Sequence, residues 1–417
     1  MDTLKTIWYV LPVYLMFNNS SFHQHFMHRY GNTRRAVQIH TNAEFGSSAI
    51  NTLFIHQFLT GNYLDESLKN SVSERFLSSN RFGLDWNSEV SYFNMNDSLI
   101  GKGWGFYAGF KNRLYAEGNF SRDLFRLAFY GNKEFAGDTA HLTGTAGSLM
   151  MYQQFQIGFI KNWTRPSSAH TLGFALSYVN GNFYNNASLQ RFTLFTEANA
   201  EYIDINANAS VNFQKSEDFT FFKNNGTGLS LDLDYQYSWE KNTISFQARD
   251  IGFIYWSRPL QSYRVDSTLL FSGVEISNVF SNPGESFTQL IDSLDQYYLK
   301  REDQAMGYLF LPTQFHAAYT RFFLDNRIVL QCGVNARISQ SYFPYTYARG
   351  IFYPHTRLMI GTSLGYGGFG TLNVGFELGV DFGKGYTMIL HTKNLEGIIP
   401  NTFSTGISAG LKLSRNF

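Results

Sequence analysis

The sequence predicts an all-β protein, a transmembrane antiparallel β-barrel of about 14 strands, and three observations lead to this fold class. Several runs alternate between apolar and polar residues over about 9 to 11 positions, the length that a tilted strand needs to cross the hydrocarbon layer of a membrane. Aromatic residues make up 18% of the chain and charged residues only 16%, whereas soluble proteins average about 25% charged residues. No stretch reaches the roughly 18 uninterrupted apolar residues of a helical membrane span.

The clearest alternating run is the segment 229–240. Its odd positions read Leu, Leu, Leu, Tyr, Tyr, Trp and its even positions read Ser, Asp, Asp, Gln, Ser, Glu. Successive side chains of a strand point to opposite faces, so one face of this segment suits lipid and the other suits water. A soluble β-sandwich also alternates and is the alternative fold. Sandwich strands usually have about 5 to 6 residues, however, so the length of this run favours the barrel.

Comparable runs place strands along most of the chain. Counted backward from the C-terminus, strands are predicted at 405–417, 385–394, 370–382, 356–366, 342–353, 327–338 and 308–321. Upstream strands are predicted at 35–58, 83–93, 103–118, 151–161, 169–180, 186–213, 227–239, 242–254 and 262–280.

The connections between these strands predict an orientation. Short turns are expected at 383–384, 354–355 and 324–326. They fall on the side of the C-terminus, which is periplasmic in bacterial barrels, so the longest connection, 281–307, falls outside the cell.

Polar side chains on the inner face of the predicted strands are candidate lumen-lining residues. They are Asp232, Asp234, Glu377 and Asp381. Such residues either line a path through the barrel or form hydrogen bonds that fill its wall, and the sequence leaves both readings open.

Three segments are expected to be helical. Asn282-Pro283-Gly284-Glu285 resembles a helix start, and apolar residues then recur at helical spacing, which predicts an amphipathic helix over 283–300 inside the extracellular loop. This helix either folds over the barrel mouth, meets a partner, or is a self-contained part of the loop. Residues 64–76 and 121–129 are weaker helix candidates, in the lumen or in loops.

The N-terminus predicts export. Lys5 precedes an apolar stretch, Ile7 to Phe17, whose length is that of a signal peptide, and we expect residues 1–21 to be removed. Residues 22–417 then form one barrel domain, and residues 22–80 are candidates for a plug inside it.

Charge and motif content exclude several functions. The formal net charge of +1 offers no field to attract nucleic acid, so no nucleic-acid partner is expected. Cys332 is the only cysteine, and the histidines at positions 23, 25 and 28 lack a nearby carboxylate or cysteine to complete a metal site. We therefore expect no metal and no cofactor.

Two motifs resemble enzyme signatures but lie in the wrong context. Gly406 to Gly410 fits G-x-S-x-G and Gly365 to Gly370 fits G-x-G-x-x-G. The first needs a strand-to-helix turn and the second needs a helix after its glycines, whereas both lie within or between predicted strands. The chain is thus expected not to be an enzyme.

Several stretches resemble a Bacteroidota outer-membrane β-barrel family of uncharacterised function. They are Phe129 to Gly137, Asp250 to Trp256, Tyr366 to Gly370, and Asn394 to Gly397. The architecture is also similar to that of the long-chain fatty-acid channel family, although the Asn-Pro-Ala segment that begins the plug of those channels has no counterpart here. The resemblance implies localisation in the outer membrane and supplies no catalytic residues.

Two functions follow as expectations. The first is a passive channel or binder for a small hydrophobic or amphipathic compound. The second is a non-transporting accessory subunit of a larger outer-membrane complex for secretion, gliding or barrel assembly. Expected partners are outer-membrane lipid, the barrel-assembly machinery during insertion, and other outer-membrane or surface proteins.

The last strand carries a predicted assembly signal and yields a test. Phe417 shares one face with Leu411 and Leu413, in the pattern by which barrels are handed to their insertion machinery. Arg415 interrupts this face near the periplasmic interface, where an arginine costs only about 0 to 1 kcal/mol. We expect Phe417→Ala to lower the amount of folded protein in the outer membrane, measured as the heat-modifiable band on a gel. An unchanged amount of that band would contradict the assignment.

Overall fold

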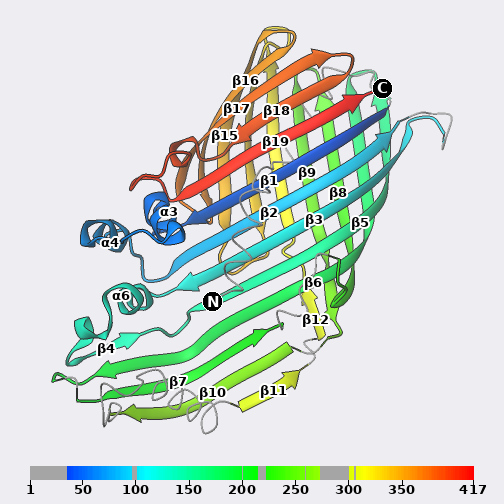
Figure 1. Ribbon diagram of the computed structural model, residues 1–417. Coiled ribbons are helices and arrows are strands. Elements are labelled where there is room, and N and C mark those ends of the chain that lie inside the picture. Colours follow the sequence, from blue (N-terminus) through cyan, green and yellow to red (C-terminus); the bar gives the residue numbers. More distant parts are fainter. Residues whose placement is uncertain are drawn as a thin grey trace.

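The computed structural model describes residues 35–95, 101–199, 201–214, 222–258, 260–272, 300–304 and 307–417. One continuous sheet, most of it wrapped into a barrel, dominates these residues (Figure 1). The strands are β1 (Arg35–Ser47), β2 (Asn80–Asn94), β3 (Trp104–Phe120), β4 (Asp138–His141), β5 (Ala146–Arg165), β6 (Ser168–Thr196), β7 (Ile203–Phe213), β8 (Gly226–Trp239), β9 (Asn242–Trp256), β10 (Leu260–Phe271), β11 (Lys300–Gln304), β12 (Gly307–Phe310), β13 (Gln314–Phe323), β14 (Ile328–Arg337), β15 (Phe343–His355), β16 (Leu358–Gly368), β17 (Leu372–Gly383), β18 (Tyr386–Thr392) and β19 (Gly406–Asn416). The helices are α3 (Thr52–Thr60), α4 (Glu66–Ser73) and α6 (Arg122–Tyr130), with short 3-10 turns η2 (Asn132–Phe135) and η4 (Leu395–Gly397).

Fourteen of the described strands form a closed antiparallel ring. Its order is β1, β2, β3, β5, β6, β8, β9, β13, β14, β15, β16, β17, β18 and β19. Pairing of β1 with β19, from Ala36 opposite Asn416 to Gly46 opposite Gly406, closes the ring. The predicted fold class, an all-β barrel of about 14 strands, is confirmed.

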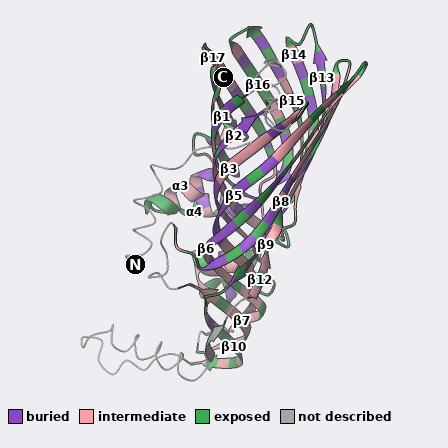
Figure 2. Cartoon of the chain, turned by 90° about the vertical axis from the view of Figure 1, so that its right-hand side faces the viewer, coloured by how far each residue is buried: buried purple, intermediate pink, exposed green. Residues whose placement is uncertain are grey.

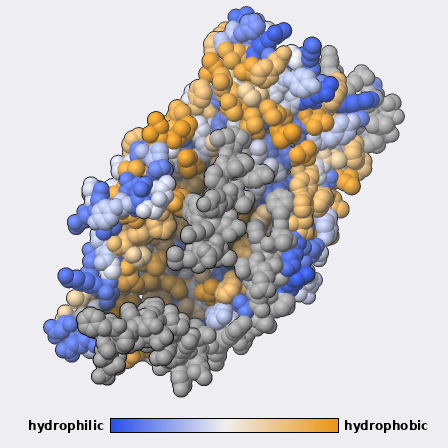
Figure 3. All heavy atoms as spheres, in the orientation of Figure 1, coloured by the Kyte–Doolittle hydropathy of each residue, from blue (hydrophilic) through white to orange (hydrophobic). Residues whose placement is uncertain are grey.

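The barrel wall alternates as the sequence predicts. On β8, Leu229 is 51% exposed on the outer face, whereas Ser230 is 2% exposed on the inner face. Figure 2 shows the same banding of buried and exposed residues along the strands. On the face drawn in Figure 3, hydrophobic side chains cover much of the wall and the most hydrophilic ones lie toward its ends. Because the outward side chains are apolar, the outer surface of the barrel suits lipid.

The two ends of the barrel differ in the length of their connections. At the end where the chain terminates, β5–β6, β8–β9, β13–β14, β15–β16 and β17–β18 are joined by turns of two to four residues. The opposite end carries α3, α4, α6 and most of the remaining strands (Figure 1). Outer-membrane barrels have short periplasmic turns and long extracellular loops, so the C-terminal end is the periplasmic one.

A sheet extends from the wall at the extracellular end. The first half of the 29-residue β6 pairs with β5 and β8 in the barrel, whereas its second half pairs with β4 and β7. The sheet then continues from β7 to β10 and β11. The described residues of two predicted strands, 186–213 and 262–280, therefore lie in this extracellular sheet and not in the membrane. The first of these strands is broken between β6 and β7, and the described part of the second lies mainly in β10, which ends at Phe271.

Three short helices pack together at the extracellular end. Their shared core includes Phe54, Leu68, Val72, Phe120 and Phe125. Helices were expected at 64–76 and 121–129, and α4 and α6 confirm both. None of the helices in the described part of the chain has the length and apolar character that crossing a membrane requires.

The prediction of a strand over 35–58 is wrong in its second half. The strand ends at Ser47, and α3 follows because the Asn51 side chain accepts a hydrogen bond from the Phe54 N–H at 2.9 Å, which caps a helix N-terminus. The chain then leaves the helix through Gly61, whose φ of 70° suits glycine. Residues 35–47 thus form wall, and α3 and α4 lie at the mouth, so the part of the predicted 22–80 plug that the structure describes does not fill the lumen.

Some predictions fall on residues outside the described part of the chain. These are the signal peptide 1–21, the histidines near position 25, and the helix over 283–300. Of the predicted loop 281–307, residues 300–304 and 307 are described: residues 300–304 form β11, and Gly307 begins β12.

One inward-facing aromatic residue allows the packing of the barrel to be tested. Trp256 is fully buried on the inner wall, where Gly181 and Gly226 let the ring approach: a Cβ at either glycine would lie 3.0 to 3.1 Å from it. We expect Trp256→Ala to lower the free energy of unfolding by about 3 to 5 kcal/mol, because it leaves a cavity among buried side chains. Trp239→Ala, on the outer face of β8, is the control. Urea unfolding in detergent, followed by the heat-modifiable band, measures both; equal effects would contradict this packing role.

Candidate functional site

Buried charges gather on the inner wall of the barrel. Asp85 lies on β2, Lys111 and Arg113 on β3, Asp250 on β9, and Arg337 on β14. The side chains of Arg113 and Asp250 are 1% and 0% exposed, and that of Arg337 is 4% exposed. We call these five residues the lumen network.

Strand alternation points four of these side chains inward. Asp85 stands between Leu84 and Trp86 and shares its face with other polar residues of β2. Opposite β2, Tyr115 pairs with Asp85, so the odd positions 111 and 113 of β3 face the lumen too. Because the period of a strand is two, the register between β2 and β3 is enough to bring these charges onto one inner surface.

A β-bulge points Asp250 inward. Between the pairs Leu231–Ile251 and Leu233–Ala248, β9 contributes two residues where β8 contributes only Asp232. Such a bulge re-aims side chains, and Asp250 adopts a φ of 57°, a left-handed conformation that aspartate tolerates better than most residues. The Asp250 N–H donates to the Asp232 carboxylate at 2.8 Å, which fixes the bulge.

Asp250 is satisfied entirely by donors from across the lumen wall. Lys111 Nζ lies 2.7 Å from one carboxylate oxygen, and Gln154 Nε2 donates to the same oxygen at 2.9 Å. Arg113 donates to the other oxygen. A fully buried carboxylate is tolerated only when its oxygens are paired and hydrogen-bonded, and this one is.

Asp85 joins opposite sides of the barrel. It accepts two hydrogen bonds from Arg113, each 3.1 Å long, and forms an ion pair with Arg337 at 2.5 Å. In the ring of strands, six strands separate β2 from β14 in either direction. Barrels with many more than about eight strands leave room for a channel or a ligand, yet here the walls touch through their side chains. The lumen network therefore bridges the barrel at this level.

Two extracellular connections fold inward beside the lumen network. Phe369, between β16 and β17, is fully buried against Tyr115 and Tyr342, with ring centroids 6.0 and 5.0 Å apart. Gly83 makes room for it, since a Cβ there would lie 2.1 Å from the Phe369 ring. Arg337 completes this cluster with its guanidinium 4.5 Å from the centre of the Tyr342 ring.

Side chains from neighbouring strands hold these connections in place through hydrogen bonds. Arg81 donates to the carbonyl oxygens of Gly368 and Gly370, at 3.3 and 2.8 Å. Across the lumen, Glu117 accepts from Ser339 and from the Ser341 N–H. The mouth is thus narrowed by the connections 338–342 and 369–371, whereas the sequence had suggested an N-terminal plug for this role.

The four predicted lumen residues fall on two strands that are not neighbours, Asp232 and Asp234 on β8 and Glu377 and Asp381 on β17. Asp232 is buried beside the bulge and accepts from Gln156 at 3.1 Å, and Asp234 pairs loosely with Arg249 at 3.6 Å. Glu377 is buried on β17, where it accepts two hydrogen bonds from Arg349 at 3.0 and 2.8 Å. Asp381 caps the periplasmic turn by accepting the Gly383 N–H at 2.7 Å.

A further pair lies at the extracellular end, between the barrel strand β1 and the connection that follows β18. Lys393 Nζ lies 2.7 Å from a Glu44 carboxylate oxygen. Burial works against the charged ammonium, but the attraction of Glu44 outweighs it and raises the pKa of Lys393 above its ordinary value. The pair ties the connection after β18 to β1.

Sequence reasoning missed the lumen network. Asp85, Lys111 and Arg113 follow an alternating pattern that could have pointed to them, since each is flanked by residues of the outer face. Asp250 could not be found in this way, because the bulge interrupts the period. The contact of Arg337 with Asp85 across the barrel could not be predicted either, because neither the alternation of residues along β2 and β14 nor their separation in the sequence indicates it.

The chemistry of the site is that of ion pairing. Three cations (Lys111, Arg113 and Arg337) surround two carboxylates, and Asp232 lies next to them. Within the residues that the structure describes, no group of three or more His, Cys, Asp or Glu side chains is placed to hold a metal ion.

A closed antiparallel barrel with an apolar outer wall, short turns at one end and an elaborate opposite end is an outer-membrane β-barrel, and the bacterial outer membrane is its location. Residues 35–389 match the family of unknown function DUF5723. The chain belongs to this family.

Solved structures of outer-membrane proteins are similar to the chain. The toluene transporter TodX of Pseudomonas putida is 10% identical over 92% of this chain and 89% of its own, with a TM-score of 0.41. A mutant of the TodX monoaromatic hydrocarbon channel, deltaS2S3, is 11% identical over 92% and 91%, with a TM-score of 0.46. A FadL homologue of Pseudomonas aeruginosa is 9% identical over 92% and 88%, with a TM-score of 0.37. No curated protein sequence matches this chain significantly.

Removing one charge from the lumen network tests how much the network contributes to the stability of the barrel. We expect Asp85→Asn to lower the free energy of unfolding by about 3 to 5 kcal/mol, because it removes the carboxylate that pairs with the buried Arg337 and leaves Arg113 with Asp250 alone. Asp266→Asn is the control, since Asp266 pairs with Arg191 on the exposed extracellular sheet at 2.9 Å and such pairs contribute about 0 to 1 kcal/mol. Urea titrations in detergent compare the two variants. Similar small effects would show that Asp85 is not needed for stability.

Proposed function

We propose that this protein binds a small hydrophobic or amphipathic compound within its barrel and admits it passively, through a lumen that the lumen network holds closed at rest. The observation that carries the proposal is the presence of apolar clusters on the inner wall both above and below the charged layer. The inner wall of a water-filled porin is polar, so apolar inner surfaces need another explanation.

The periplasmic cluster lies on the inner faces of β13 to β18. It consists of Phe322, Val329, Ile351, Tyr353, Met359 and Ile389. On β15 the change from polar to apolar is visible within one strand, because Arg349 faces the lumen and Ile351 and Tyr353 follow it on the same face. A compound that passed the charged layer would meet apolar side chains here.

The extracellular cluster lies on the inner faces of β5, β6 and β9 and on the segments that follow β9. It consists of Met150, Tyr152, Val179, Tyr184, Ile254, Trp256, Leu260 and Leu311. An amphipathic compound suits such an interior, since its apolar part can contact these clusters while its polar part meets the buried charges between them.

Neutralising the cross-lumen pair tests the proposal. The double variant Asp85→Asn, Arg337→Gln keeps both side chains polar but removes the ion pair that joins β2 to β14. We expect wild type to give little conductance in planar bilayers and slow uptake of a hydrophobic naphthylamine dye by proteoliposomes, and the variant to raise both. The matched control is Asp266→Asn, Arg191→Gln on the extracellular sheet, which should leave both unchanged.

Two results would overturn the proposal. One is a folded double variant with wild-type conductance and wild-type dye uptake. The other is dye uptake by wild type no faster than by vesicles that lack protein.

The alternative is a non-transporting accessory subunit of an outer-membrane secretion, gliding or barrel-assembly complex. The extracellular sheet favours it, because Leu270 on β10 is 69% exposed beyond the barrel wall. A photo-crosslinking residue at position 270 should then give one discrete adduct in cells, whereas the same residue at Tyr63, 85% exposed near α3, should not. Identical patterns at both positions would count against a specific partner.

A further inference from the structure

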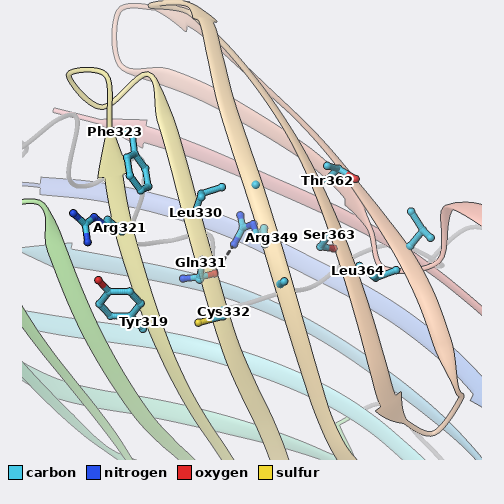
Figure 4. A pocket seen from close by; sticks show the side chains of 13 residues that line it. Tyr319, Arg321, Phe323, Leu330, Gln331, Cys332, Arg349, Thr362, Ser363 and Leu364 are labelled. Atoms are coloured by element: carbon cyan, nitrogen blue, oxygen red, sulfur yellow. Dashed lines mark hydrogen bonds between the residues drawn. The ribbon is translucent and has the colours of Figure 1, made fainter.

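A groove of about 560 Å³ lies on the outer surface of the barrel. It crosses β13, β14, β15, β16 and the start of β17, and Figure 4 shows it from close by. Ten of its thirteen lining residues alternate to the outer face: Tyr319, Arg321, Phe323, Leu330, Cys332, Ala348, Gly350, Thr362, Leu364 and Val374. The other three, Gln331, Arg349 and Ser363, lie between these residues on the same strands, at positions that alternate to the lumen. Because most of its lining lies on the outer face, the groove is separate from the lumen.

Small residues create the groove. The middle of the groove is lined by four small residues, Cys332, Ala348, Gly350 and Thr362. Larger side chains stand at its two ends, such as Tyr319 on β13 and Leu364 on β16. A lipid-facing wall normally presents large apolar side chains, as on the outer face of β8. The run of small residues on adjacent strands leaves a channel in the outer surface instead.

The register of the strands shows how the groove runs through the membrane. Arg321, Leu330, Gly350 and Thr362 are consecutive cross-strand partners. Arg321 lies two residues before the end of β13, whereas Gly350 lies five residues before the end of β15. The groove thus begins at the periplasmic rim and moves into the hydrocarbon layer, and five strands at about 4.8 Å spacing give it a length of roughly 19 Å.

The end of the groove at the rim is cationic. Arg321 is exposed, with its guanidinium 5.4 Å from the centre of the Phe323 ring, and among the described residues no carboxylate lies within ion-pair distance of it. Arg327 and Asp325 lie on the turn that follows β13, Arg357 lies on the next turn, and the turn on the other side of β13 carries Lys241 and Glu240, so at this rim four cations face two carboxylates. A positive charge at the interface and an apolar path leading away from it match an anionic headgroup with an acyl chain.

We propose that this groove is a binding site for an anionic phospholipid of the periplasmic leaflet. The phosphate contacts Arg321, and one acyl chain lies along the groove over Cys332, Ala348 and Gly350 toward Leu364. The lipid belongs to the periplasmic leaflet, because the cationic end of the groove, where the headgroup binds, lies at the periplasmic rim. Its ligand contacts lie on the lipid face of the barrel, so the site is independent of any passage through the lumen.

Native mass spectrometry of the detergent-purified full chain, titrated with phosphatidylglycerol or phosphatidylcholine, tests the site. We expect one phosphatidylglycerol adduct that forms about ten-fold more tightly than any phosphatidylcholine adduct, since hydrogen bonds to charged groups contribute at that scale. Arg321→Gln should remove this preference. Gly350→Leu should weaken the adduct by filling the groove, and a Cβ fits at this glycine, whose nearest neighbour would be Leu330 at 3.6 Å.

The chain offers a matched control for each variant. Arg415 also precedes a phenylalanine by two residues at the periplasmic end, with its guanidinium 4.7 Å from the centre of the Phe417 ring, but it lies outside the groove. Ala108 faces lipid four residues from the periplasmic end of β3, at a depth similar to that of Gly350. Arg415→Gln and Ala108→Leu should leave the phosphatidylglycerol adduct unchanged.

The only cysteine gives a test that needs no altered fold. Alkylation of the exposed Cys332 by an N-alkyl maleimide places bulk inside the groove and should abolish the adduct in wild type, while the same reagent should have no effect on Cys332→Ala. Three outcomes would each overturn the proposal and indicate unspecific surrounding lipid only. They are equal adducts with both lipids, equal losses of the adduct in the groove and control variants, and an adduct that survives alkylation of Cys332.

Discussion

The lumen network, with Arg113 held between Asp85 and Asp250, is the interaction on which the shape of the barrel depends. Moving one ion from water into a protein interior costs several kcal/mol, so each of these buried charges is tolerable only while its partners stay in place. Asp250 on β9 and Arg337 on β14 find their partners on β2 and β3, with which their strands share no backbone hydrogen bonds, so the requirement for compensation fixes the distance between these parts of the wall. A barrel of fourteen strands is thereby kept narrow at this level.

Backbone features elsewhere follow from the same constraint. The bulge in β9 and the left-handed conformation of Asp250 are needed to direct that carboxylate toward Lys111 and Arg113. Phe369 can cover the network only because Gly83 lacks a side chain, and Gly367 and Gly368 adopt the φ values of 111° and 71° that turn the connection inward. In the sequence Gly367 and Gly368 lie in the run Gly365 to Gly370, which resembles a nucleotide-binding motif, but their physical role is to let an aromatic side chain pack against the inner wall.

The predictability of the fold and that of the network differ for a physical reason. Alternation is a local property, so a segment such as 229–240 shows its two faces within one strand, and the barrel class could be inferred from such runs. Strands outside the membrane alternate too, which is why β7 and β10 were not distinguished from wall strands. Contacts across the lumen join residues more than a hundred positions apart, as Arg113 and Asp250 are, and nothing local in either segment encodes them.

The outer groove and the inner charges share the same strands but are separable. Arg349 faces inward between Ala348 and Gly350, which face outward, and its guanidinium is held by Glu377 and Gln331 on the lumen side. The small outer residues therefore leave the anchoring of β15 to its neighbours intact, since that anchoring is made on the inner face and by the backbone. A substitution at Gly350 alters the surface that lipid contacts, and one at Asp85 alters the contact between opposite walls. The period of two that defines each strand thus gives the barrel two independent surfaces, one facing the membrane and one facing the lumen, and lets each be tested without disturbing the other.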